Sequence, residues 1–244
     1  MKCKLCLENK KLVKSHIIPE FFYKSIYSNS HSRKISVLST DKIPTEFLNL
    51  QKGIREKILC NDCEQIISPW EKYARELIYG SSLLKVHSDS NLIQIEGVDY
   101  KKLKLFGISL IWRASVSRKS FFEDVKLGCH EEVIRNMLLM AEPGYEYQYA
   151  IVLWAIKMKN SPIKDLVMQP DKLFDEGFTY FRFILGSFMW LFIISRDGRP
   201  FCLKDFYLKS DGSILIPKME ISEPELFPEF FKKMKTRGQA KIWI

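Results

Sequence analysis

The chain has 244 residues, of which 46% are hydrophobic and 27% are charged, so it can bury a sizeable core and is not a disordered protein. Its formal net charge is +9, and residues 1–80 hold 14 Lys and Arg against 9 Asp and Glu, so the basic excess is densest in the first third. This balance suits a polyanionic partner such as nucleic acid, although charge alone reports nonspecific attraction and not fold.

No secretory or membrane-spanning segment is expected. The amino terminus turns polar within two residues, and the apolar run from Phe183 to Ser195 is shorter than the about 20 residues that a membrane helix needs. We therefore expect a cytoplasmic protein that is not associated with a membrane. In that reducing compartment, paired cysteines are metal ligands before they are disulfides.

The first third is predicted to hold two short strands and one helix. Alternating apolar residues predict a strand over residues 12–18, and residues 56–59 predict a second strand. Residues 68–71 (Ser-Pro-Trp-Glu) have the pattern of a capping box with Ser68 as N-cap, which predicts a helix from there to about Tyr79.

The remaining residues, 81–244, are predicted to form a separate α+β domain of unknown role, in which helices pack on an antiparallel sheet. Residues 103–116 are apolar nearly all round and predict a buried helix, and residues 131–140 predict a second one. Segments rich in aromatic and β-branched residues then predict strands, with a tight hairpin at Gly186-Ser187. Residues 222–235 predict a terminal helix that covers the sheet.

Two Cys-x-x-Cys motifs bracket the first third: Cys3 with Cys6, and Cys60 with Cys63. A two-residue spacer lets each pair grip a tetrahedral Zn²⁺ from one side, and four thiolates satisfy the ion. Lengthening the connecting loop from about 17 to about 53 residues costs only about 1 kcal/mol by chain-closure scaling. A structural zinc contributes roughly 10–16 kcal/mol in small peptides, so the long loop is tolerated. The motifs therefore predict one structural zinc site. Two unrelated reduced pairs, or a redox pair, fit the spacing less well.

The order of these motifs resembles that of the HNH endonucleases, which have a zinc-stabilised ββα-metal core. More narrowly, the chain looks like a bacterial group of HNH-like proteins that often occur near phage-defence systems. It shares with them the motifs Ser15-His16-Ile17-Ile18-Pro19 and Cys60-Asn61-Asp62-Cys63-Glu64. The resemblance covers residues 1–80 and implies a treble-clef-like zinc module there, which the predicted α+β domain follows.

The resemblance also implies a chemistry for this module. His16 would be the general base that takes a proton from the attacking water, a role that suits an imidazole at neutral pH. A divalent ion, Mg²⁺ or Mn²⁺, would stabilise charge on the scissile phosphate. Glu64 stands where the family has its second metal ligand, and a carboxylate binds Mg²⁺ well. Ser15 stands where the family commonly has an acidic ligand.

Three functions stay open at this point. The first is a metal-dependent endonuclease that hydrolyses DNA, with RNA less favoured. The second is a zinc module without catalysis that binds nucleic acid or a partner protein. The third is a structural subunit whose C-terminal domain carries an interface to a partner or to a second copy. Each candidate residue also has a structural alternative: His16 as a hydrogen-bonding strand residue, Glu64 as an acid favoured by the helix dipole. For the nucleic-acid functions, the candidate phosphate contacts are Lys14, Lys52, Arg55 and Lys57.

Overall fold

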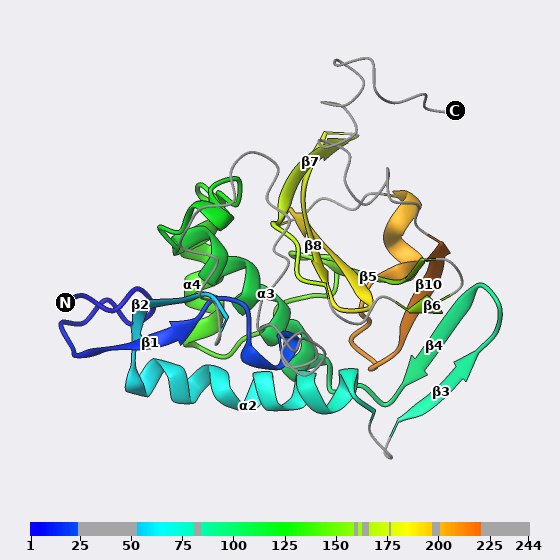
Figure 1. Cartoon of the computed structure of the whole chain (residues 1–244), viewed down its shortest axis with the longest axis horizontal. Coiled ribbons are helices and arrows are strands. Elements are labelled where there is room, and N and C mark those ends of the chain that lie inside the picture. The colour runs from blue at the N-terminus through cyan, green and yellow to red at the C-terminus, as the bar shows by residue number, and fades with distance from the viewer. Residues whose placement is uncertain are drawn as a thin grey trace, which may run out of the picture.

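The structure is a computed structural model that describes residues 1–23, 53–80, 84–158, 161–162, 166–175, 177–196 and 201–220. Figure 1 shows the helices and strands of these residues in chain order. They are β1 (Leu12–His16), β2 (Arg55–Cys60), α2 (Asn61–Ile78), β3 (Lys85–Ser88), β4 (Leu92–Glu96), α3 (Tyr100–Val116), α4 (His130–Leu139), β5 (Ile151–Met158), β6 (Ser161–Pro162), β7 (Asp171–Asp175), β8 (Phe178–Leu185), β9 (Phe188–Ile194) and β10 (Ile214–Glu220).

The first region folds as a β-hairpin followed directly by a helix. β1 and β2 pair antiparallel, with Leu12 opposite Cys60 and His16 opposite Arg55. Both predicted strands are confirmed, although β1 ends at His16 because the chain turns there toward Pro19. α2 begins at the residue after β2, so the hairpin and the helix share the Cys60–Cys63 segment.

The predicted start of α2 is wrong. The helix begins at Asn61 and not near Ser68, so Pro69 lies inside it and no capping box forms there. Proline within a helix removes one backbone hydrogen bond and costs about 3 kcal/mol. Here Pro69 and the preceding turn residue Gln65 are both exposed, so water can satisfy the carbonyl group that proline leaves unpaired.

α3 is a buried helix, as its apolar sequence predicted. Nearly every residue from Leu103 to Ser115 is buried. In Figure 1 it lies between the other two helices and the large sheet. Gly107 allows a close approach to that sheet, because a Cβ atom there would lie 2.3 Å from the Cδ1 atom of Ile151 on β5. The ring of Phe106 packs edge-on against Trp190 on β9, with 5.6 Å between the ring centroids.

The large sheet has eight strands in the order β3-β4-β10-β5-β9-β8-β7, with β6 paired to β5. The predicted hairpin is confirmed, since Leu185 pairs with Phe188 across Gly186-Ser187. The expectation of an antiparallel sheet is wrong in one place: β10 inserts beside β5 and runs parallel to it. A strand's own sequence does not reveal the direction of its neighbour, because its side chains alternate in the same way in both cases. The predicted terminal helix, residues 222–235, lies outside the described residues.

A continuous cluster of buried residues links the two predicted domains. It includes Ile58 on β2, Trp70 on α2, Trp112 on α3 and Trp190 on β9. The polar residues 87–91 form the end of β3 and the turn into β4. In the described part of the chain, no helix combines the length and the apolar character that crossing a bilayer requires.

Candidate functional site

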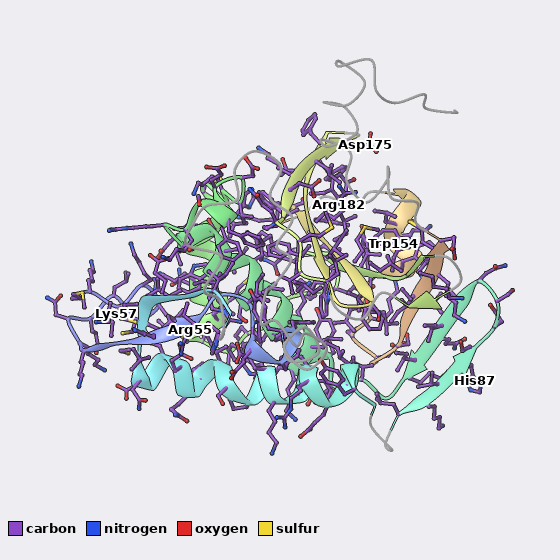
Figure 2. The ribbon with its side chains drawn as sticks, viewed as in Figure 1. Arg55, Lys57, His87, Trp154, Asp175 and Arg182 are labelled. Carbon is purple, nitrogen blue, oxygen red and sulfur yellow. The ribbon has the colours of Figure 1, made fainter. Side chains whose placement is uncertain are left out.

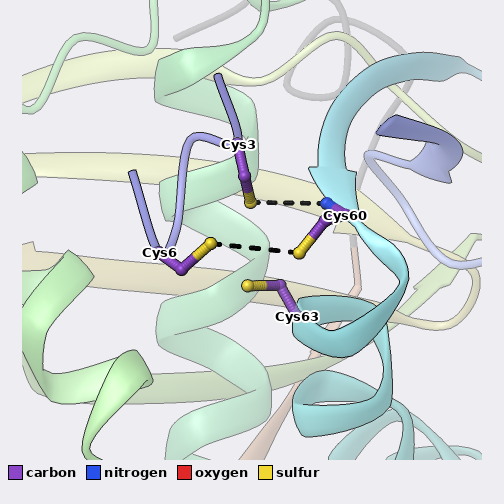
Figure 3. Close-up of side chains that lie close together, drawn as sticks. All are labelled: Cys3, Cys6, Cys60 and Cys63. Atoms are coloured by element: carbon purple, nitrogen blue, oxygen red, sulfur yellow. Dashed lines mark hydrogen bonds between the residues drawn. The ribbon is translucent and has the colours of Figure 1, made fainter. Parts of the chain in front are cut away.

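The two Cys-x-x-Cys motifs meet in space, as the sequence predicted. The Sγ atoms of Cys3, Cys6, Cys60 and Cys63, which we call the cysteine cluster, all lie within 4.8 Å of one another (Figure 3). Cys6 Sγ and Cys60 Sγ are 3.9 Å apart, close to the edge of about 3.8 Å that a tetrahedron with Zn–S bonds of about 2.3 Å has. Four sulfurs in this geometry could bind a metal ion such as zinc. No second group of three or more potential metal ligands lies together among the described residues.

A tight turn presents the first two cysteines. Leu7 N–H donates to Cys3 O at 3.0 Å, and Leu7 itself has a φ of 63°. Leucine rarely adopts this left-handed conformation, which persists only where the surroundings fix it. The turn is attached to β2 by the Lys4 N–H, which donates to Ile58 O at 2.9 Å.

The other two cysteines come from the junction of β2 and α2. Cys60 is the N-cap of α2 and donates its N–H to Cys3 Sγ at 3.3 Å, as the dashed line in Figure 3 shows. Cys63 follows in the first helical turn. The amino-terminal end of a helix carries partial positive charge, which favours thiolates over thiols. Local structure therefore prepares both pairs for a cation.

Burial and hydrogen bonding shift the pKa of three thiols of the cluster. Burial raises the pKa of Cys3, but hydrogen bonds from the backbone of Cys6, Cys60 and Leu5 outweigh it and lower this pKa to about 7. Burial, followed by the hydrogen bonds of the neighbouring thiols, raises the pKa of Cys63, and burial raises that of Cys6. Like charges at this spacing cannot all ionise by themselves. A divalent cation removes that restriction and deprotonates its thiol ligands.

A helix of the second region holds the turn that carries Cys3 and Cys6. Arg135 on α4 donates from Nη1 to Leu5 O at 2.6 Å, and the guanidinium is fixed by Glu132 at 2.6 Å. The side chain of Arg135 is 12% exposed. No sequence pattern could have identified this residue, because 130 positions separate the two partners.

The hairpin gathers three predicted phosphate contacts and His16 on one face. Arg55 lies opposite His16 in the register, and paired residues project to the same side of a sheet. Lys14 and Lys57 lie two positions along their strands from His16 and Arg55 and are exposed, whereas His16 and Arg55 are half-buried. We call Lys14, Arg55 and Lys57 the basic face; Figure 2 labels Arg55 and Lys57 on the hairpin. Lys52 lies outside the described residues.

The two positions where the HNH family has metal ligands differ in their surroundings. Glu64, in the first turn of α2, is half-buried, and its Oε1 atom is buried with no hydrogen-bond partner among the described residues. Burying a carboxylate oxygen is costly unless a donor or a cation satisfies it, so this position of Glu64 is suited to holding a cation. Ser15 lies on the opposite face of the hairpin from His16 and is 1% exposed, so its hydroxyl cannot reach a metal on the His16 face.

A residue of α3 that sequence reasoning missed contacts the end of β1. Arg113, in the last turn of α3, donates from Nη1 to His16 O at 2.8 Å and to Glu71 Oε1 at 2.6 Å. Glu71 on α2 is thus an ion-pair partner of Arg113 and not the capping residue that the sequence suggested. The apolar pattern of α3 gave no signal for Arg113 beyond the presence of a charge in a buried helix.

Comparisons with known proteins add no assignment. A scan against protein-family models, a search of curated proteins and a search of solved structures each found no match to this chain. The cysteine cluster, the basic face and the surroundings of His16 are therefore the observations from which a function is inferred.

Proposed function

We propose that residues 1–80 form an HNH-type, treble-clef-like zinc module and that the protein is a metal-dependent endonuclease acting on DNA. The observation that carries this proposal is the shared hairpin face, on which His16 stands beside Lys14, Arg55 and Lys57. Three cations around one imidazole suit a phosphodiester backbone. The cations would position the phosphates, while the imidazole would act as the general base on the attacking water.

The proposed roles divide among three groups of residues. The cysteine cluster fixes the hairpin against α2, as a structural zinc site does. The basic face binds the phosphate backbone, and His16 accepts a proton from the water that attacks phosphorus. Glu64 offers its unpaired oxygen to Mg²⁺ or Mn²⁺, which when bound would stabilise negative charge on the scissile phosphate.

A second candidate function, nucleic-acid binding without cleavage, is favoured by Ser15. Its side chain is buried on the wrong face and replaces the acidic ligand of the family, so the divalent ion would have fewer protein ligands. The basic face and the zinc module would serve such a binding protein equally well.

Plasmid nicking in Mg²⁺ or Mn²⁺ separates the two functions. We expect the wild type to nick supercoiled DNA and His16→Ala to be about 100- to 10,000-fold slower, the range that general-base catalysis contributes. His87→Ala is the matched control, because His87 is exposed on β3 at the far end of the molecule in Figure 2. Equal rates for wild type and His16→Ala would exclude this catalytic mechanism. A salt-dependent DNA mobility shift without nicking would then favour the binding protein.

A further inference from the structure

The guanidinium group of Arg113 connects β1, α2 and α3. Its Nη1 donates to the backbone oxygen of His16 at the end of β1 and to Glu71 Oε1 on α2, while its Nε donates to Ser109 O within α3 at 3.2 Å. The Arg113 side chain is 1% exposed and that of Glu71 is 26% exposed. The end of β1 is therefore attached to the helix that forms the centre of the second region.

This arrangement is expensive for the fold. Burying a guanidinium costs several kcal/mol, and a single partly exposed carboxylate does not fully offset that cost. In addition, the Nη2 atom of Arg113 is buried without a hydrogen-bond partner in the described residues. Apolar residues would fill this position in α3 at lower cost, so stability does not explain the choice of arginine.

The backbone at His16 is the point that needs to be held. β1 ends there, and the pairing of β1 with β2 is irregular between Val13 and Ser15. A register shift bends the strand and re-aims nearby side chains, so the direction of the imidazole depends on how the end of β1 is held. Arginine offers several donors in a rigid plane, so one guanidinium can fix a carbonyl and a carboxylate relative to each other.

We propose that Arg113 is a positioning residue for His16: it locks the backbone at the end of β1 against α2 and α3 and so sets where the imidazole stands on the basic face. The region after residue 80 then supplies a residue that the site needs, so residues 1–80 do not form the site by themselves. This inference rests on the proposed function for its catalytic consequence, but the positioning itself is a property of the fold.

The test follows the His16 imidazole by NMR in the full chain with labelled histidine rings. The chain has 4 histidines, and His16→Gln assigns the relevant signals. We expect Arg113→Met to shift or broaden the ring signals of His16, while those of His87 and His130 stay in place. Arg135→Met is the matched comparison, because it removes an arginine that also binds a backbone carbonyl but on the cysteine turn. It should leave the His16 signals unchanged and speed the release of zinc to a chelator.

Arg113→Lys keeps the charge beside Glu71 but lacks the planar fork. We expect it to fold, to retain zinc and to give His16 signals between those of wild type and Arg113→Met. In the nicking assay, Arg113→Met should lower the rate on the order of 100-fold, as displacement of a reacting group by about 1 Å does.

Three results would overturn the positioning role: unchanged His16 signals in Arg113→Met, wild-type signals in a folded Arg113→Lys, or an equal disturbance of His16 by Arg135→Met. If the wild type does not nick DNA, the proposed function fails, and the NMR comparison still decides whether Arg113 positions His16.

Discussion

The basic face makes a quantitative prediction about salt. Each phosphate that a protein cation neutralises contributes about −0.9 to the slope of log K against log salt concentration. If Lys14, Arg55 and Lys57 each neutralise one phosphate, replacing all three by alanine should reduce the steepness of that slope by about 2.7. Between 50 and 200 mM salt, wild-type affinity should then fall about 40-fold more than the affinity of the triple variant.

The measurement is fluorescence anisotropy of a labelled duplex of about 20 base pairs, titrated with protein at several NaCl concentrations without divalent ions, so that no cleavage occurs. The matched control replaces Lys85, Lys101 and Lys172, which are exposed on β3, α3 and β7. Both triple variants lose three positive charges from the +9 of the wild type, so general electrostatics change equally. Equal slopes for the two variants would refute the assignment of the basic face.

Three further predictions concern the metal sites and a buried lysine. If the cysteine cluster holds zinc as proposed, stripping it with a chelator should remove on the order of 10 kcal/mol, comparable with the whole stability of a domain. Because Trp70 and Trp190 share one core, the near-UV circular dichroism of both regions should then collapse together, and a retained spectrum after metal loss would contradict this. Glu64→Gln should weaken Mn²⁺ binding at least about tenfold in a calorimetric titration, whereas Glu76→Gln, an exposed change on the same helix, should not. Burial lowers the pKa of Lys104 to about 7, while an unfolded lysine keeps its proton up to about pH 10, so the burial cost is fully present below pH 7 and disappears as pH rises. The free energy of unfolding should therefore increase by about 4 kcal/mol from pH 7 to pH 10. Lys104→Met removes the titrating group and should lack this increase. A wild-type protein whose stability does not rise over this pH range would show that Lys104 is not buried in this way.

Local patterns in the sequence were sufficient to predict the elements whose signal lies within their own residues. The alternation in β1 and β2, the apolar run of α3 and the Gly186-Ser187 hairpin were all predicted, and the structure confirms them. The start of α2 was not predicted correctly. The capping pattern at Ser68 competes with an earlier start that the cysteine cluster and the end of β2 impose. Tertiary context overrides a cap of about 1 kcal/mol.

The sequence by itself determined the ligands of the candidate metal centre and the residue types of the basic face, since fixed spacing and strand alternation are local properties that survive in any fold. Only the tertiary structure decided that the face carrying Ser15 is buried, that β10 runs parallel to β5, and that two arginines of distant helices hold the module. The two arginine contacts join residues 97 and 130 positions apart in the chain, and no periodicity encodes such a meeting. The sequence marked Arg113 only as a charge inside a predicted buried helix; its partners, the His16 carbonyl and Glu71, became visible only in the packing of α3.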